Sequence, residues 1–186
     1  VQFFKNFKGL RIINIARLTD QKDHITLLKS INKVVKNYKL DLKLCIIGGG
    51  KNIELLLEYI NKNKLNKTVN LLGYKKNAEQ YIKHSDLFVL SSDSEGFGMV
   101  LVEALGYGKT IVATDCESGP REILGNSEHG YLCSVDNPER LAESINTAHL
   151  NKLNPNILLK RYKDFDISLI GKEYLTLMQK MKSDQS

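Results

Sequence analysis

The sequence predicts a single α/β domain, a doubly wound, Rossmann-like parallel sheet with helices on both faces. Short, nearly continuous apolar runs alternate with longer segments whose apolar residues recur every three or four positions. Buried parallel strands have the first pattern, and the helices that cover them have the second. No linker rich in proline, glycine and serine divides the 186 residues, so we expect one domain over residues 1–186.

The first two strand–helix pairs have the clearest patterns. Residues 10–15 form an apolar, β-rich run, and residues 23–38 place six apolar side chains on one helical stripe. Residues 42–47 predict the second strand and residues 52–63 the second helix. The glycines at 48–50 match neither the complete dinucleotide fingerprint nor a P-loop. They indicate a tight turn near a ligand or a purely structural turn.

The rest of the chain continues the alternation. Strands are expected at residues 69–72, 86–91, 110–114 and 130–135. Helices are expected near 77–84, from Gly98, from Pro120, at 138–149, and in two segments after residue 154. The last segment has apolar residues in helical register up to Met181, more than a finished domain needs, and is a candidate to dock elsewhere.

Composition restricts the partners. The net charge of +6 divides into +11 over residues 1–83 (17 basic, 6 acidic) and −5 over residues 84–186 (10 basic, 15 acidic). A basic half favours an anionic partner, but the lysines are not interleaved with aromatic residues, which disfavours nucleic acid. Three scattered cysteines without a C-x-x-C motif argue against disulfides and a metal site. With no secretory signal or long apolar run, we expect a cytoplasmic location.

Unusual residues gather where the predicted strands end. In open α/β sheets, ligands bind outside the carboxyl ends of the strands. The segments that follow the first five strands contain glycine, hydroxyl or charged residues: Arg17 and Lys22, Gly48 to Gly50, Gly73 and Tyr74, Ser91 to Gly98, and Asp115 to Pro120. Their convergence predicts one ligand crevice at this edge of the sheet.

Two cations, Arg17 and Lys22, follow the first strand in "ARLTDQKD". A guanidinium grips phosphate through two hydrogen bonds, and an ammonium acts as a mobile point charge. Together they can neutralise a diphosphate without a metal. The alternative is a surface lysine beside an arginine that pairs with Asp20 or Asp23.

Two glutamates, Glu95 and Glu103, flank the Gly-Phe-Gly step in "SEGFGMVLVEALGYG". Gly96 and Gly98 allow close backbone approach, and the amides at the next helix start form an anion site. Glu103 lies roughly 7 Å further along that helix, too far to share a proton or metal with Glu95. The pair can accept hydrogen bonds from the two ends of a hydroxyl-rich ligand. Alternatively, Glu95 only favours the helix start and Glu103 is solvated.

These residues together resemble the C-terminal, donor-binding half of a GT-B fold glycosyltransferase of family four (glycosyl transferases group 1), the large retaining group. The marks of that family are an Arg and a Lys after the first strand, an E-x7-E segment, and a helix of small residues. Here they are Arg17 and Lys22, then Glu95 and Glu103 in "EGFGMVLVEALGYGKTIVAT". The resemblance runs from about residue 10 to the end, and the tail "FDISLIGKEYLTLM" is similar to the family's closing helix.

The resemblance implies a nucleotide-diphosphate sugar as donor, with a UDP-sugar as the first choice, and no metal or other cofactor. Arg17 and Lys22 would hold the diphosphate and stabilise the leaving group. Glu95 would bind the transferred sugar, and these three residues would be catalytic. Glu103 would bind the ribose hydroxyls. The backbone from Gly96 through Phe97 and Gly98 to Met99 would line the sugar and phosphate site, and Gly73 and Tyr74 would line the base site.

The resemblance also implies that an N-terminal, acceptor-binding domain is absent from this chain. The complete enzyme would transfer a hexose or N-acetylhexosamine with retention to a glycan or lipid-linked acceptor, in polysaccharide biosynthesis. It would work in the cytoplasm, with a peripheral position on the inner membrane face as an option. The isolated residues 1–186 would bind donor but hardly turn over.

Two other functions remain open from the residues alone. One is a non-catalytic, flavodoxin-like nucleotide-binding domain, although a receiver would need acidic residues where Arg17 stands. The other is a nucleotide-sugar epimerase, against which the spacing of Glu95 and Glu103 argues.

Overall fold

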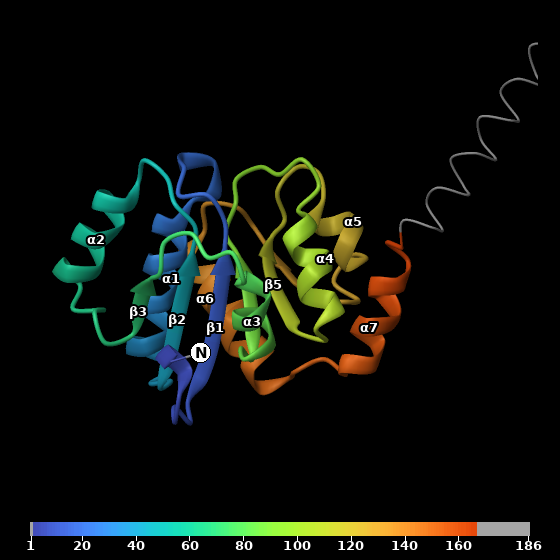
Figure 1. The fold of residues 1–186 in the computed structure, drawn as a ribbon, viewed down its shortest axis with the longest axis horizontal. Helices are drawn as coiled ribbons and strands as arrows, with labels where there is room; N and C mark the ends of the chain where they lie inside the picture. The colour runs from blue at the N-terminus through green and yellow to red at the C-terminus, as the bar shows by residue number, and fades with distance from the viewer. Residues whose placement is uncertain (1, 167–186) are drawn as a thin grey trace, which may run out of the picture.

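Six parallel strands form one sheet in the computed structural model, which describes residues 2–166 (Figure 1). Their order across the sheet is β3-β2-β1-β4-β5-β6. This is the order of a doubly wound Rossmann-like sheet, so the predicted fold class is confirmed. The strands are β1 (Leu10–Ile15), β2 (Leu42–Ile47), β3 (Val69–Leu71), β4 (Leu87–Leu90), β5 (Thr110–Thr114) and β6 (Tyr131–Cys133).

The helices also follow the predicted pattern. They are α1 (His24–Asn37), α2 (Ile53–Lys62), α3 (Ala78–Lys83), α4 (Met99–Gly106), α5 (Pro120–Leu124), α6 (Pro138–Leu150) and α7 (Pro155–Lys163). Two short 3-10 turns, η1 (Gln2–Phe4) and η2 (Asp20–Lys22), were not predicted. The helix expected at the C-terminal end lies outside the described residues.

Polar side chains start several of these helices where the sequence changes from strand to helix. Asp23, with a left-handed φ of 35°, accepts a hydrogen bond from the Thr26 amide and begins α1. Asn137 caps α6 in the same way. The proline that follows it costs no hydrogen bond, because the first helical amide has no partner in the helix.

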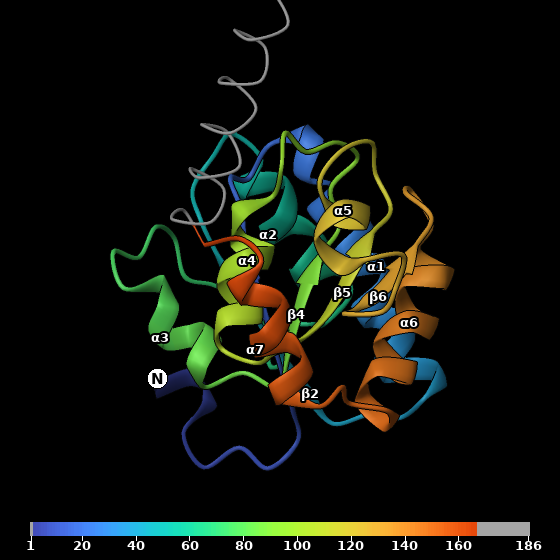
Figure 2. The same ribbon diagram turned by 90° about the vertical axis from the view of Figure 1, so that its right-hand side faces the viewer.

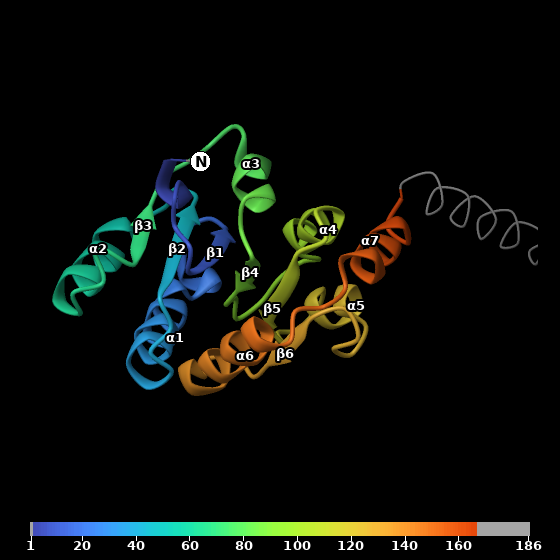
Figure 3. The same ribbon diagram turned by 90° about the horizontal axis from the view of Figure 1, so that it is seen from below.

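Helices cover both faces of the sheet because successive strand side chains point to opposite sides. Ile12 and Leu44 belong to an apolar layer that includes side chains of α1, α2 and α6. Ile13 and Phe88 belong to the opposite layer, together with α3, α4, α5 and α7. Figure 3 shows α1 and α6 on one side of the sheet and α3 and α4 on the other. Figure 2 shows α7 beside α4, against which it packs.

The strand order reverses between β1 and β4, the two central strands. Their backbone ladder is short and joins Ile12 to Leu87 and Ile13 to Phe88. The helices that follow them, α1 and α4, pack on opposite faces of the sheet. The β1–α1 and β4–α4 segments therefore start from the same edge of the sheet, the upper edge in Figure 1, and lead to helices on opposite faces; ligands bind at this position in open α/β sheets.

Candidate functional site

Arg17 and Lys22 lie in the β1–α1 segment, at the point where the strand order reverses. Within residues 2–166, the exposed Arg17 side chain has no hydrogen-bond or ion-pair partner. The two acidic residues considered as its partners are engaged elsewhere: Asp20 pairs with Lys51, and Asp23 caps α1. The guanidinium therefore remains available to an anion.

Lys22 contacts Glu95 directly. The Lys22 Nζ atom lies 2.6 Å from Glu95 Oε1, and the two side chains are only 13% and 9% exposed. Ser92 Oγ donates a second hydrogen bond to the same carboxylate oxygen, at 2.6 Å. The sequence predicted that both residues face one crevice, but it did not predict this ion pair. The pairing follows from the adjacency of β1 and β4, which residue spacing does not reveal.

Backbone and side-chain hydrogen bonds join the two segments that carry this ion pair. Ser91 Oγ donates to the Lys22 carbonyl at 3.0 Å. The Asp93 amide donates to the Gln21 carbonyl at 2.9 Å, and Gln21 Nε2 donates to the Ser94 carbonyl at 2.9 Å. We call this set of contacts between residues 21–22 and 91–95 the seam. It fixes Lys22 and Glu95 relative to each other.

The three glycines after β2 support the β1–α1 segment. A Cβ atom on Gly48 would lie 1.9 Å from the Ala16 carbonyl oxygen, and one on Gly50 would lie 2.3 Å from that of Leu18. The Leu18 amide donates to the Gly49 carbonyl at 2.9 Å. Of the two interpretations of these glycines, the structure supports the structural turn: it lets the Arg17 segment pack closely against the next loop.

The Gly-Phe-Gly step shapes the start of α4. Gly98 has a φ of 86°, a conformation that favours glycine, and α4 begins at the next residue, Met99. Gly119 of the β5–α5 segment packs against this step, since a Cβ atom there would lie 2.0 Å from the Phe97 carbonyl oxygen. Gly96 and Met99 are exposed, so the backbone at the start of α4 is accessible.

Glu103 lies on α4 in a separate groove of about 870 Å³ between α3, α4 and α7. Burial, and then the charge of Glu79, raise the pKa of its carboxyl group. The β3–α3 segment and α3 contribute Lys76, Ala78 and Glu79 to this groove. Gly73 and Tyr74, the predicted base-binding turn, do not line it, and Tyr74 is 80% exposed. Glu103 lines this groove and Glu95 does not, so the contact of the two glutamates with opposite ends of one ligand stays a prediction.

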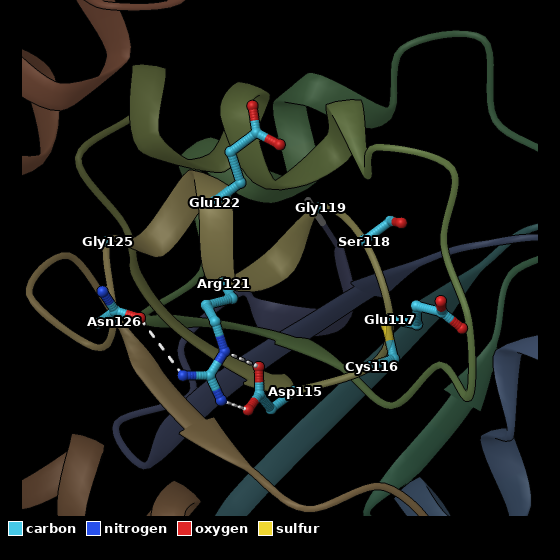
Figure 4. Close-up of a pocket in the computed structure, with 9 residues that line it drawn as sticks. All are labelled: Asp115, Cys116, Glu117, Ser118, Gly119, Arg121, Glu122, Gly125 and Asn126. Carbon is cyan, nitrogen blue, oxygen red and sulfur yellow. Dashed lines mark hydrogen bonds and ion pairs between the residues drawn. The ribbon is translucent and has the colours of Figure 1, made fainter.

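A pocket of about 610 Å³ lies where β5 ends, in the segment predicted to face the crevice (Figure 4). Arg121 reaches across it and pairs with Asp115, and its Nη1 atom donates to Asn126 Oδ1 at 3.3 Å. Sequence reasoning did not single out Arg121. Because Asp115 neutralises it, this third cation is less available to an anion than Arg17 is.

Three further features concern metal ligands, cysteines and membrane-spanning segments within the part of the chain that the structure describes. No group of three or more His, Cys, Asp or Glu side chains there is arranged to hold a metal ion. Cys45, Cys116 and Cys133 are buried, as expected, and burial raises the pKa of each thiol. Among residues 2–166, no helix has the length and hydropathy to span a bilayer.

Known sequences that are similar to this chain are glycosyltransferases. Residues 2–165 match the family model for glycosyl transferases group 1. An uncharacterized glycosyltransferase of Methanocaldococcus jannaschii is 34% identical over 90% of this chain and 49% of its own length. The N-acetylgalactosamine-N,N'-diacetylbacillosaminyl-diphospho-undecaprenol 4-alpha-N-acetylgalactosaminyltransferase of Campylobacter jejuni is 34% identical over 88% of this chain and 45% of its own. The chain thus spans about half the length of these curated relatives.

Solved structures share the fold. The pneumococcal O-GlcNAc transferase GtfA, in complex with UDP and GlcNAc, matches with a TM-score of 0.81 at 22% identity, over 92% of this chain and 35% of that one. HepE of Anabaena, in complex with UDP, matches with a TM-score of 0.80 at 21% identity, over 92% and 49%. The chain belongs to the glycosyl transferases group 1 family and has the fold of a GT-B glycosyltransferase C-terminal domain.

Proposed function

We propose that this chain is the donor-binding domain of a retaining glycosyltransferase of family four, and that its donor is a UDP-hexose or UDP-N-acetylhexosamine. The observation that carries the proposal is the arrangement of the two cations. Arg17 is free of partners among residues 2–166, and Lys22 lies 2.6 Å from Glu95 at the reversal of strand order. Cations beside a carboxylate suit a ligand with an anionic part next to a hydroxyl-rich part.

Each residue then has a distinct role. Arg17 and Lys22 bind the diphosphate and stabilise the charge that develops on it as the bond to the sugar breaks. Glu95 accepts hydrogen bonds from the sugar hydroxyls, and the backbone of residues 96–99 lines the sugar and phosphates. Glu103 accepts hydrogen bonds from the ribose. A raised pKa makes its carboxylate a stronger acceptor once it is ionised.

The base lies against the β3–α3 segment. Gly73 and Tyr74 are the residues proposed to contact it, with Lys76 and Ala78 completing the path from that turn to the Glu103 groove. A planar base can stack on the side chain of Tyr74, since this residue is 80% exposed. No metal takes part in this proposal, because the two cations supply the positive charge that the diphosphate needs.

The acceptor site is proposed to lie in a second domain, N-terminal to this one. The half-length match to the curated relatives supports such a domain. The Campylobacter relative is named for a diphospho-undecaprenol acceptor. We therefore propose a glycan or lipid-linked acceptor in polysaccharide biosynthesis, with the enzyme in the cytoplasm or peripheral to the inner membrane face. The family match favours this transferase over the flavodoxin-like and epimerase alternatives.

A binding panel tests the proposal. Calorimetry of the 186-residue chain with UDP, UDP-glucose, UDP-N-acetylglucosamine, UDP-N-acetylgalactosamine, GDP and NAD should show selective binding of the uridine ligands, unchanged by EDTA. The chain alone should not transfer sugar to an acceptor. Absence of binding for every nucleoside diphosphate would contradict the donor assignment, and loss of binding with EDTA would contradict the proposal that no metal takes part. Sugar transfer by the chain alone would contradict the need for a second domain.

A further inference from the structure

Two buried polar side chains beneath the site are not used by the function proposed above. Asn14, in β1, is fully buried, and His24, the first residue of α1, is 2% exposed. Neither would contact a ligand in the crevice. Burying polar groups is costly unless they form hydrogen bonds, so their contacts show what they contribute.

These two side chains extend the connection between β1 and β4 beyond the end of the backbone ladder. The ladder stops at the pair Ile13–Phe88. One residue further along β1, Asn14 Nδ2 donates to the Val89 carbonyl of β4 at 2.9 Å. The side-chain amide therefore takes the place of a backbone hydrogen bond where the two central strands diverge.

The same amide holds the start of α1. Asn14 donates through its nitrogen, so its Oδ1 atom is the acceptor for His24 Nε2, 3.1 Å away. His24 Nε2 must then carry the hydrogen, which leaves Nδ1 without one. Burial, and then the positive charge of Lys22, lower the pKa of His24 to about 4, so the ring is neutral at physiological pH.

This contact lies close to Lys22 along the chain. His24 follows Lys22 by two residues, and Ser91 Oγ holds the Lys22 carbonyl from the other side at 3.0 Å. The Lys22 backbone is thus fixed between α1 and the end of β4. Its ammonium group reaches Glu95 from that fixed position.

We propose that Asn14 and His24 are positioning residues of the diphosphate site: they hold the Lys22 segment against the end of β4 and so set Lys22 relative to Glu95. This inference rests on the proposed binding of a nucleoside diphosphate. The residues act through Lys22 and do not touch the ligand. They lie 10 positions apart in the sequence and form one unit with the Val89 carbonyl.

Five variants distinguish a positioning role from an effect on overall stability. His24→Leu removes the hydrogen bond to Asn14, and His24→Gln keeps an N–H that can reach it. Ser30→Ala is the matched control, because Ser30 is also buried in α1 but donates only to the Leu27 carbonyl. The last two are Lys22→Ala and the double variant Lys22→Ala with His24→Leu.

Calorimetry with UDP is the first measurement. His24→Leu should weaken UDP binding about five- to tenfold, His24→Gln should recover most of that loss, and Ser30→Ala should change it less than about twofold. In the Lys22→Ala background, His24→Leu should have no further effect, since residues acting as a unit are not additive. An equal loss with and without Lys22, or no loss in His24→Leu, would overturn the proposal.

Hydrogen exchange of the Asp93 amide is the second measurement and needs no ligand. This amide donates to the Gln21 carbonyl and reports the seam. Its exchange should accelerate at least about tenfold in His24→Leu but not in Ser30→Ala. If the unmodified chain does not bind UDP, the proposed function fails while this exchange still decides the positioning role: unchanged exchange would overturn it. Asn14→Ala breaks the same link and replaces His24→Leu if that variant does not fold.

Discussion

Replacement of Glu95 by glutamine should strengthen the binding of UDP. In this structure the Glu95 carboxylate lies 2.6 Å from the Lys22 ammonium group. A phosphate that binds Lys22 must therefore share the ammonium with Glu95 or displace the carboxylate from it. If Glu95 contacted only the sugar, the same replacement would leave UDP binding unchanged. Tighter UDP binding in Glu95→Gln is therefore expected only if Glu95 competes with the phosphate for Lys22.

The magnitude follows from Coulomb's law. A phosphate and a carboxylate that share one ammonium lie roughly 5 Å apart, and at effective dielectric constants of about 20 to 80 they repel each other by about 1–3 kcal/mol. Glu95→Gln removes that repulsion, so the dissociation constant of UDP should fall at least about fivefold. A UDP-sugar should gain less, because the variant also loses a charged acceptor for the sugar, worth about 1.5–3 kcal/mol.

The assay is calorimetric titration of UDP and of one UDP-sugar into the chain and its variants. Glu117→Gln is the matched control, because it removes a charge from the neighbouring exposed segment but Glu117 has no ion-pair partner in the described region. Denaturant unfolding comes first, since leaving the largely buried Lys22 unpaired should cost about 3–5 kcal/mol of stability. Unchanged or weaker UDP binding in folded Glu95→Gln would refute the competition, and equal changes for both ligands would refute the sugar contact.

Three other predictions follow from the site. Arg17→Ala should weaken the binding of UDP about ten- to a hundredfold and have little effect on the binding of uridine. Stability should change little, because the Arg17 guanidinium is exposed and has no partner within residues 2–166. Calorimetry with both ligands checks this. Glu103→Ala should weaken UDP and a UDP-sugar by similar factors in the same titrations, and loss of the UDP-sugar alone would contradict the ribose contact. The pKa of His24 is lowered to about 4, so the unfolded chain takes up a proton between pH 6.5 and 4 that the folded chain does not, and the free energy of unfolding should fall by about 3 kcal/mol as the pH drops through that range. Urea denaturation should show this fall, and His24→Gln should remove it.

The sequence predicts most of the fold because each local pattern agrees with the final structure. The strand at residues 42–47 and the helix that begins near Gly98 are present as expected. Hydrophobic periodicity and the residues that start and end helices act over short distances, so they can be recognised in a single sequence. The meeting of the β1–α1 and β4–α4 segments at one edge could be predicted for the same reason, since the carboxyl ends of parallel strands share that edge.

The contacts within the site were not predictable in this way. Lys22 and Glu95 are far apart in the sequence, and their ion pair depends on which strands are neighbours and on side-chain conformations. The role of Asn14 was missed because a single polar residue inside an apolar run gives no periodic signal. The interpretation of Gly48 to Gly50 needed the structure as well, because only the position of the β1–α1 segment shows what approaches them.

The short ladder between β1 and β4 also has a consequence for how the chain folds. Each half of the sheet, β1-β2-β3 and β4-β5-β6, is built from consecutive strands, whereas the contact from Asn14 to Val89 closes a loop of 75 residues. Long loops carry an entropic cost before their contacts form, so we expect each half to gain structure before the two halves join. The proposed donor site lies on that junction, because Lys22 comes from one half and Glu95 from the other. If the proposed function holds, UDP binding should require the completed sheet, and its recovery during refolding should follow the joining of the halves rather than the formation of the first helices.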